Sequence, residues 1–438
     1  MAENKRVGVI SLGCDKNRVD TEKMLSIVKQ KHHLTSDIED AEIIIVNTCA
    51  FLESARKEAV DEILSAILLK EQGNTQKIIV TGCLPQKFID QIKDELPEVD
   101  AFMGVSDYGL INDVIDRIYN DERVVAVGVP RGECSTNRTL TTSSYAYLKI
   151  ADGCSNHCTY CLIPYIRGKY RSVPLDDLIK EACGLGSVKE LILVAQDTAR
   201  YGVDLGGEIT LVTLIRKLTS LDNIGSIRLL YCYPENITDE LIKEIKENDK
   251  VIKYIDIPFQ HADDKILKLM NRKGTGKGYL ELINKLRLAV PEIAIRSTFI
   301  AGFPTESEEQ FNNLLEFIKD AKLFNAGFFK YSKEEGTPAF RLDGHLKESI
   351  KTARVKKLYS VQKKVVKEYG KQLVGKVITI TAQGFDDDEF IYYGRAYFNA
   401  PDIDGKVFFF SGEEVEYGQD YQVKIIKATG YDLYGERL

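Results

Sequence analysis

The sequence predicts an α/β protein in three parts: a parallel α/β sheet, a partial parallel barrel of six βα units and a small antiparallel β-barrel. Three observations lead to this prediction. The 438 residues are about three times the length of a common single domain, so more than one core is expected. Apolar, β-branched runs alternate with helical patterns over most of the chain, which is typical of parallel sheets. After Gly375 the pattern changes to short runs with the period of β-strands.

Composition and charge exclude several classes of protein. Apolar residues make up 44% of the chain and charged residues 29%, which excludes a disordered or collagen-like protein. No apolar run approaches the ~18 residues of a membrane span, so we expect no membrane partner and a cytoplasmic location. The net charge of −7 disfavours nucleic acid as the main partner. Nine cysteines without an export signal indicate thiols that serve metals or redox chemistry.

The first part, residues 1–135, repeats a unit of an apolar strand, a sharp turn and a helical pattern. Each predicted strand is followed by a cysteine: Cys14, Cys49 or Cys83. Ligands of open parallel sheets bind beyond the carboxyl ends of the strands, so these cysteines are expected to converge on one point. Packing as small buried hydrophobic residues is the alternative. The predicted strands are residues 7–12, 42–46 and 77–80, with a helix at residues 54–70.

The second part, residues 136–370, repeats a strand and a helix six times, which predicts a partial rather than a closed eightfold barrel. Residues 131–144 are rich in hydroxyl side chains and indicate a linker before it. Strand alternation points Arg296 and Asp256 into the lumen, where a buried cation needs a partner, so we expect an ion pair. The predicted strands are residues 145–151, 190–195, 227–233, 252–259, 293–300 and 326–331. The predicted helices are residues 175–183, 239–247, 265–270 and 307–321.

The third part, residues 371–438, follows a predicted helix. Residues 345–370 have an apolar stripe at helical spacing, and residues 351–371 hold eight basic side chains and one acidic, which we interpret as a solvated helix face. Strands predicted at residues 376–381, 390–398, 406–410 and 421–428 form a small antiparallel barrel. This part contains seven basic and twelve acidic residues, a poor match for tRNA and a good one for a basic protein.

Cys154, Cys158 and Cys161 form a C-x3-C-x2-C motif just after the first barrel strand, on the face where βα loops build active sites. Three thiolates on one loop can hold three irons of a four-iron cluster and leave the fourth iron open for a substrate. The alternative is a zinc site with His157 as fourth ligand. The remaining cysteines, Cys134, Cys183 and Cys232, have no such partners and are interpreted as structural.

This motif in this position resembles the radical S-adenosylmethionine (SAM) superfamily. The resemblance implies that the three cysteines bind a [4Fe-4S] cluster, that its open iron chelates the amino and carboxylate groups of SAM, and that reduction yields a 5′-deoxyadenosyl radical. Ile300 and Gly302 lie in a segment similar to the superfamily's G-x-I-x-G-x-x-x-E, which lies against the adenine. Gln196 and Asp197 stand where a G-G-E motif would hold the SAM amino group. Gln260, expected to face the lumen with Ile300, completes the predicted SAM contacts.

The first part resembles the methylthiotransferases, which join such a region to a radical SAM barrel and a C-terminal TRAM domain. The resemblance is carried by Ser-Leu-Gly-Cys-Asp-Lys-Asn at residues 11–17, Asn-Thr-Cys at 47–49 and Thr-Gly-Cys at 81–83. It implies that Cys14, Cys49 and Cys83 hold a second [4Fe-4S] cluster with a free iron for the incoming sulfur.

One branch of this family modifies an adenosine of tRNA, and the other modifies the β-carbon of an aspartate in small-subunit ribosomal protein S12. Residues 11–17 are closer to the second branch's S-L-G-C-x-K-N than to G-C-Q-M-N, and residues 195–202, 231–234, 256–261 and 296–300 also favour it. We therefore expect a basic ribosomal protein as substrate rather than tRNA. No catalytic side chain is expected beyond the clusters, because the cofactors carry the difficult chemistry. An electron donor and a sulfur donor are required and remain unidentified. A non-catalytic iron–sulfur protein that docks on ribosomes is the alternative.

Overall fold

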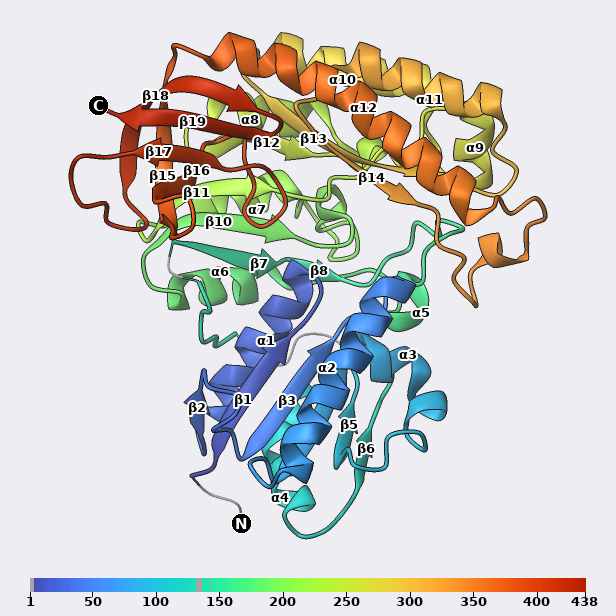
Figure 1. The fold of residues 1–438 in the computed structure, drawn as a ribbon, viewed down its shortest axis with the longest axis vertical. Helices are drawn as coiled ribbons and strands as arrows, with labels where there is room; N and C mark the ends of the chain where they lie inside the picture. Colours follow the sequence, from blue (N-terminus) through green and yellow to red (C-terminus); the bar gives the residue numbers. More distant parts are fainter. Residues whose placement is uncertain (1–3, 131–135, 143) are drawn as a thin grey trace.

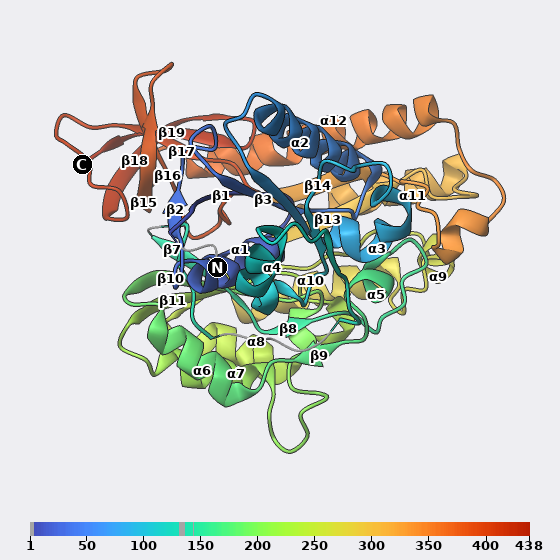
Figure 2. The same ribbon diagram turned by 90° about the horizontal axis from the view of Figure 1, so that it is seen from below.

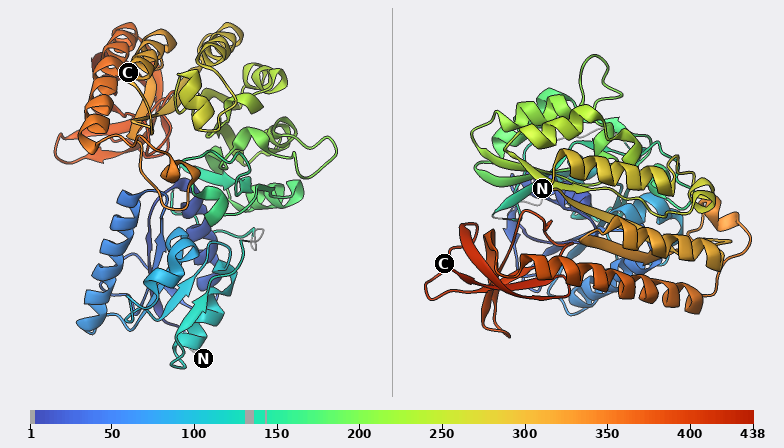
Figure 3. Two further views of the ribbon diagram at one scale, coloured as in Figure 1. Left: turned by 90° about the vertical axis from the view of Figure 1, so that its right-hand side faces the viewer. Right: turned by 90° about the horizontal axis from the view of Figure 1, so that it is seen from above.

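The computed structural model describes residues 4–130, 136–142 and 144–438. Figure 1 shows the N-terminal sheet at the bottom, the barrel sheet above it and the C-terminal strands at the upper left. The left view of Figure 3 shows the same two layers, with the N-terminal sheet and its helices below the barrel. Figure 2 agrees with Figure 1 in placing the C-terminal strands and α9 on opposite sides of the molecule.

The N-terminal sheet has six parallel strands in the order β2-β1-β3-β4-β5-β6. The three predicted strands are confirmed, and the other three have only three residues each, too few to show a pattern in the sequence. The strands are β1 (Arg6–Ser11), β2 (His33–Thr35), β3 (Ile43–Thr48), β4 (Lys77–Gly82), β5 (Ala101–Met103) and β6 (Val124–Ala126). The helices are α1 (Asp15–Val28), α2 (Glu53–Glu71), α3 (Cys83–Ile92) and α4 (Ile111–Ile118).

The second sheet is a curled, open half-barrel of six parallel strands in the order β14-β13-β12-β11-β10-β7. All six predicted strands are confirmed. They are β7 (Tyr145–Lys149), β10 (Val188–Val194), β11 (Ile224–Leu229), β12 (Val251–Asp256), β13 (Ala294–Ala301) and β14 (Asn325–Lys330). Their helices are α6 (Leu175–Gly184), α7 (Leu211–Thr219), α8 (Asp239–Glu247), α9 (Asp264–Leu269), α10 (Gly276–Ala289) and α11 (Glu308–Ala321).

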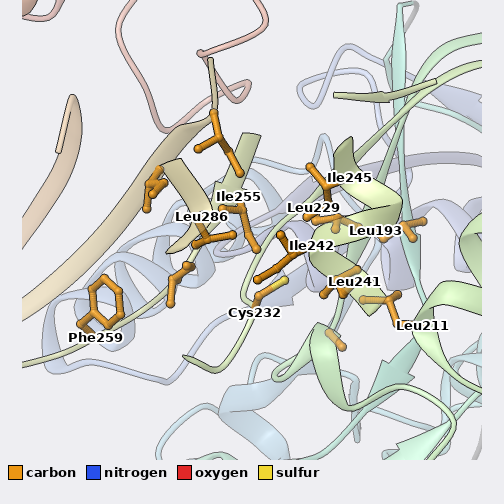
Figure 4. Close-up of a cluster of buried hydrophobic side chains, with 14 of the residues drawn as sticks. Leu193, Leu211, Leu229, Cys232, Leu241, Ile242, Ile245, Ile255, Phe259 and Leu286 are labelled. Carbon is orange, nitrogen blue, oxygen red and sulfur yellow. The ribbon is translucent and has the colours of Figure 1, made fainter. Parts of the chain in front are cut away.

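Apolar side chains between these strands and helices form the largest core of the protein. Leu193, Leu229 and Ile255 point outward from neighbouring strands and meet Leu241 and Ile242 of α8 (Figure 4). The same core contains Cys232, which is fully buried. Cys183 is exposed on α6, and Cys134 lies outside the described residues.

The opposite, lumen face of the sheet carries a second apolar cluster, which includes Tyr147 and Tyr254, together with several buried charged residues. Arg296 Nη1 lies 3.0 Å from Asp256 Oδ1, which confirms the predicted ion pair. Arg296 Nε also lies 3.1 Å from Asp404 Oδ1, and Asp404 accepts a hydrogen bond of 2.7 Å from Tyr254. Asp404 belongs to the loop between two C-terminal strands, so the C-terminal part closes this end of the lumen.

The C-terminal part is a closed barrel of five strands in the order β15-β16-β17-β19-β18, as predicted. Four strand pairs are antiparallel, and the pair β17–β19 is parallel. The last strand follows a tight turn at Gly430 (φ +61°) and lies beyond the predicted runs. The strands are β15 (Val377–Asp386), β16 (Ile391–Arg395), β17 (Val407–Phe410), β18 (Asp420–Thr429) and β19 (Asp432–Arg437).

Helix α12 (Glu348–Leu373) connects the half-barrel to this domain and carries the basic run. The predicted solvated face is wrong for Lys351 and Arg354, which are buried. Lys351 Nζ donates to Tyr331 O at 3.0 Å, and Arg354 Nη1 donates to Glu306 O at 2.9 Å. Lys351 therefore fixes the segment that follows β14 and Arg354 the segment that follows β13, while Lys356 and Lys363 are exposed.

The predicted linker has no helix or strand in residues 136–142, yet one of its side chains is fully enclosed. Arg138 forms ion pairs with Glu22 of α1 and with Glu181 of α6, the latter at 3.0 Å. This segment therefore fastens the N-terminal sheet to the half-barrel. In the parts of the chain that the structure describes, none of the helices has the length and apolarity to cross a bilayer.

Candidate active site

Cys14, Cys49 and Cys83 lie at the carboxyl ends of the adjacent strands β1, β3 and β4. In the register, Ser11 pairs with Asn47 and Asn47 pairs with Thr81, so these three strand ends are level. Cys14, Cys49 and Cys83 follow these paired residues, Ser11, Asn47 and Thr81, by three, two and two positions. The three thiols therefore converge at one edge of the sheet, as the sequence predicts.

Backbone geometry leaves a cradle at this edge. Gly13 has φ +90°, and a Cβ built on it would lie 2.6 Å from Cys49 Cβ and 3.0 Å from Cys49 Sγ. Gly82 has φ +97°, and a Cβ there would lie 2.4 Å from Asn47 Oδ1. Both loops thus need glycine for close approach. Three converging thiols fit an iron–sulfur cluster bound through three cysteines.

Two of these cysteines also begin helices. Cys14 is the N-cap of α1 and Cys83 is the first residue of α3, so unpaired N–H groups and the helix dipoles favour thiolates there. Burial opposes this and raises the pKa of Cys83 to about 12. Arg167 compensates, because its Nη2 lies 3.8 Å from Cys83 Sγ. The site is thus built to hold negative charge once its thiols are ligated.

We expect Gly13→Ala to remove the cluster at this site with little effect on the fold. The matched control is Gly73→Ala, which has a similar φ of +84° but no atom within 4 Å of a built Cβ. Both variants bear a backbone penalty of about 1 kcal/mol, and only Gly13→Ala pushes into Cys49. After anaerobic reconstitution, iron should fall from about eight to about four atoms per chain in Gly13→Ala alone. Equal iron in both variants would contradict the cradle.

The second set, Cys154, Cys158 and Cys161, lies on the loop after the two-residue strand β8 (Ala151–Asp152) and before the short helix α5 (Ile163–Ile166). Contacts from distant segments fix this loop. Thr159 N donates to Met270 O at 3.1 Å, and Thr159 O accepts from Ala339 N at 2.8 Å. Burial raises the pKa of Cys154 to about 11, and also raises that of Cys161.

The zinc alternative required His157 as a fourth ligand. His157 is exposed, with φ 52°, and its carbonyl accepts a hydrogen bond of 3.0 Å from Asn271 Nδ2. In the ranges that the structure describes, no group of three or more His, Cys, Asp or Glu side chains is placed to hold a single metal ion. Cysteines that bind three different irons of a cluster lie farther apart than the ligands of a single metal ion.

Gln196 and Asp197 lie just beyond β10, beside this cysteine loop. Asp197 Oδ2 accepts hydrogen bonds from Asn156 of the loop at 3.0 Å and from Asn236 at 2.7 Å. Burial raises the pKa of Asp197. Gln196 Nε2 donates to Asp152 Oδ1 at 3.0 Å, while Gln196 Oε1 is buried and has no partner among the described residues. That free acceptor suits the amino group of SAM.

Gln260 and Ile300 are neighbours at the ends of β12 and β13, because Ile300 N donates to Gln260 O at 2.7 Å. Ile300 packs against the apolar cluster that also borders Tyr160 of the cysteine loop. Gly302, in contrast, faces α12, since a built Cβ would lie 2.5 Å from Lys351 Cγ. The roles of all three residues in binding SAM stay predictions.

Two arginines that the motifs did not single out complete the site. Arg272 Nη1 lies 4.0 Å from Cys158 Sγ, and its guanidinium lies 3.9 Å from the centre of the Tyr233 ring. Arg167 Nη1 pairs with Asp152 Oδ2 at 2.9 Å. Burial raises the pKa of Asp152, but Arg167 and Lys149 outweigh it and hold this pKa well below the ordinary range.

These contacts join the two cysteine sets. Arg167 touches Cys83 with one nitrogen and Asp152 with the other, and Asp152 in turn binds Gln196. A continuous buried path therefore runs from the N-terminal thiols to the predicted SAM residue. Sequence reasoning missed Arg167, because no motif of its own segment, Arg-Gly-Lys-Tyr at residues 167–170, indicates this role.

Comparison with known proteins assigns each region separately. Family models match residues 6–104 (Uncharacterized protein family UPF0004), residues 148–318 (Radical SAM superfamily) and residues 374–438 (TRAM domain). Two solved structures share the fold. They are the radical S-adenosylmethionine methyltransferase TsrM from Kitasatospora setae (TM-score 0.56, 12% identity, 77% of each chain) and the cobalamin-dependent enzyme OxsB (TM-score 0.52, 15% identity, 82% of this chain and 58% of that one).

Curated relatives match nearly the whole chain. The Ribosomal protein uS12 methylthiotransferase RimO of Acetivibrio thermocellus is 47% identical over 446 residues, covering 99% of this chain and 98% of the relative. The protein of the same name from Clostridium botulinum is 46% identical over 436 residues, covering 98% and 97%. A third, from a Thermoanaerobacter species, is 42% identical and covers 99% and 100%.

Proposed function

This chain belongs to the radical SAM methylthiotransferases of the ribosomal protein uS12 type, and from that premise we propose the division of labour within it. The chain is an enzyme that adds a methylthio group to ribosomal protein uS12. We propose that the acceptor is the β-carbon of an aspartate. We also propose a cytoplasmic location, because the substrate is a ribosomal protein.

We propose two [4Fe-4S] clusters, one on Cys154, Cys158 and Cys161 and one on Cys14, Cys49 and Cys83. When bound, the first supplies reductive cleavage of SAM to a radical, and the second supplies the site for the transferred sulfur. The chain's own residues orient the reactants. Gln196 Oε1 accepts from the SAM amino group, and Asp197 holds the cysteine loop through Asn156.

The observation that carries this proposal is the buried path from Cys83 through Arg167 and Asp152 to Gln196. Charged groups are expensive to bury unless paired, yet Asp20, Lys149, Asp152 and Arg167 form one enclosed network at this junction. It joins the N-terminal sheet to the half-barrel, which supports the proposal that the two cysteine sets act together. We propose the same three parts as from the sequence: residues 1–135, 136–370 and 371–438.

Anaerobic reconstitution with iron and sulfide tests the proposal against its alternatives. About eight irons per chain, two clusters of four, together with SAM cleavage on reduction support the enzyme. About four irons per chain would contradict the proposal of a second cluster. Eight irons without SAM cleavage would favour a ribosome-docking scaffold, and bound zinc in place of iron would favour a structural site.

The acidic C-terminal barrel is proposed to attract the basic substrate. Asp387, Asp388 and Glu389 are exposed at the turn between β15 and β16, and Asp386 holds this turn by accepting from the backbone N–H groups of Asp388 and Glu389. Reversing residues 387–389 to Lys, with Asp386 kept, should slow association with uS12 about tenfold at low salt. Stopped-flow association at ~0.01 M and ~0.15 M salt measures this effect, which screening reduces.

The matched control reverses Asp94, Glu95 and Glu98, three exposed acidic residues of the N-terminal sheet domain, and changes the net charge equally. It should leave the association rate nearly unchanged. Equal slowing in both variants would show that net charge, not this turn, attracts the substrate.

A further inference from the structure

Lys16 is a nearly enclosed cation at the positive end of a helix. It follows Cys14 by two residues, and its side chain is 10% exposed. The N-terminus of α1 repels a cation through the helix dipole, and burial adds a desolvation cost. Lys16 Nζ is compensated by Asp15 Oδ1 at 3.1 Å and by the ring of Tyr231, whose centre lies 3.4 Å away. The burial of Lys16 therefore has a cost in free energy, which suggests a functional role for this cation.

A series of contacts leads from the ammonium toward the second cysteine set. Tyr231 follows β11 at the mouth of the half-barrel, and its hydroxyl donates to Asp15 Oδ1 at 3.4 Å, beside Cys14. Two residues later, Tyr233 stacks with Arg272, which reaches Cys158 Sγ at 4.0 Å. The segment 231–233 therefore spans from the N-terminal thiols to the SAM loop, and Lys16 rests on it.

Polar groups around the ammonium have capacity left for a ligand. An ammonium carries three N–H donors, and the carboxylate of Asp15 meets it through Oδ1. Asp15 Oδ2 is buried and has no hydrogen-bond partner in the described ranges, so it is free to accept an N–H. Ser11, Gly13 and Cys14 are exposed at the same edge, which leaves the site open to a protein substrate.

We propose that Lys16 binds the side-chain carboxylate of the substrate aspartate. This assignment rests on the function proposed above and names the group that selects its substrate. A carboxylate on Lys16 lies on Tyr231, and the carbon next to that carboxylate is then held between the two cysteine sets. Asp15 Oδ2 accepts from the peptide backbone of the substrate. A charge-assisted hydrogen bond in a nearly dry site favours a carboxylate over a neutral amide.

The test compares binding of uS12 with binding of uS12 in which the modified aspartate, located in the wild-type product, is replaced by Asn. Binding is measured on the reconstituted enzyme without reductant, so that no turnover occurs. The wild type should bind the Asp form about 10- to 100-fold more tightly than the Asn form. Lys16→Met, of similar length but uncharged, should bind the two within about threefold. Lys16→Arg should keep most of the preference.

Lys29→Met, at the opposite, exposed end of α1, is the matched control and should bind as the wild type does. Iron content reports whether each variant holds its clusters. If the wild type leaves uS12 unmodified, the proposed function fails and the assignment of Lys16 with it. If the wild type modifies uS12 but Lys16→Met keeps its preference for the Asp form, only the assignment of Lys16 is overturned.

Discussion

Replacing Cys154, Cys158 and Cys161 together by Ala will abolish reductive cleavage of SAM. In the proposed function these three thiols hold a four-iron cluster with one open iron, and no other described cysteine lies on this loop to replace them. The half-barrel should still fold, because the loop is held by Thr159 and Asn156 as well as by the thiols. Release of 5′-deoxyadenosine on reduction, measured by chromatography, should fall to background.

The same variant should retain about four irons per chain, since the N-terminal set lies on a different sheet. Cys183→Ala, which removes an exposed cysteine of α6, is the control and should behave as the wild type does. Substantial 5′-deoxyadenosine from the triple variant would place SAM cleavage elsewhere.

Replacing Cys14, Cys49 and Cys83 together by Ala has the complementary effect. SAM cleavage should continue, because the loop of residues 154–161 keeps its own ligands, while methylthio transfer to uS12 should fall below detection. The measurement is 5′-deoxyadenosine and modified uS12 from one reaction mixture. Methylthiolated product from this variant would show that the N-terminal cysteines are structural.

Local patterns were sufficient to predict the strands that carry chemistry. The convergence of Cys14, Cys49 and Cys83 follows from three long apolar runs and from the rule that parallel strands end at one edge. The ion pair of Arg296 and Asp256 follows from strand alternation and the cost of an unpaired buried charge. Both arguments need only the residues themselves and the fold class.

Other features depend on contacts between distant segments. Lys351 and Arg354 were interpreted as solvated because their partners, Tyr331 and Glu306, belong to other elements of the half-barrel. Arg167 lies 84 residues from Cys83 in sequence, and nothing local indicates that one guanidinium joins two sites. Strands of three residues such as β2 are too short to show a periodic pattern in the sequence. They form because they pair with neighbouring strands of the sheet.

The acidic composition of the C-terminal part indicates a positively charged partner, and the structure shows how the acidic turn is exposed. Asp386 holds the backbone of the turn, so the residues that follow it point into solvent. The same domain closes the lumen through Asp404 and Arg296. This domain therefore carries the turn proposed to attract the substrate and also contacts Arg296 in the lumen of the half-barrel.

The choice of a ribosomal protein over tRNA as substrate is open to direct measurement. Both candidate substrates are incubated with the reconstituted wild type, SAM, a reductant and sulfide and are then analysed by mass spectrometry. We expect uS12 to carry one methylthio group in place of a hydrogen on an aspartate, with tRNA unchanged. Methylthiolated adenosine in tRNA beside unmodified uS12 would overturn the proposed function.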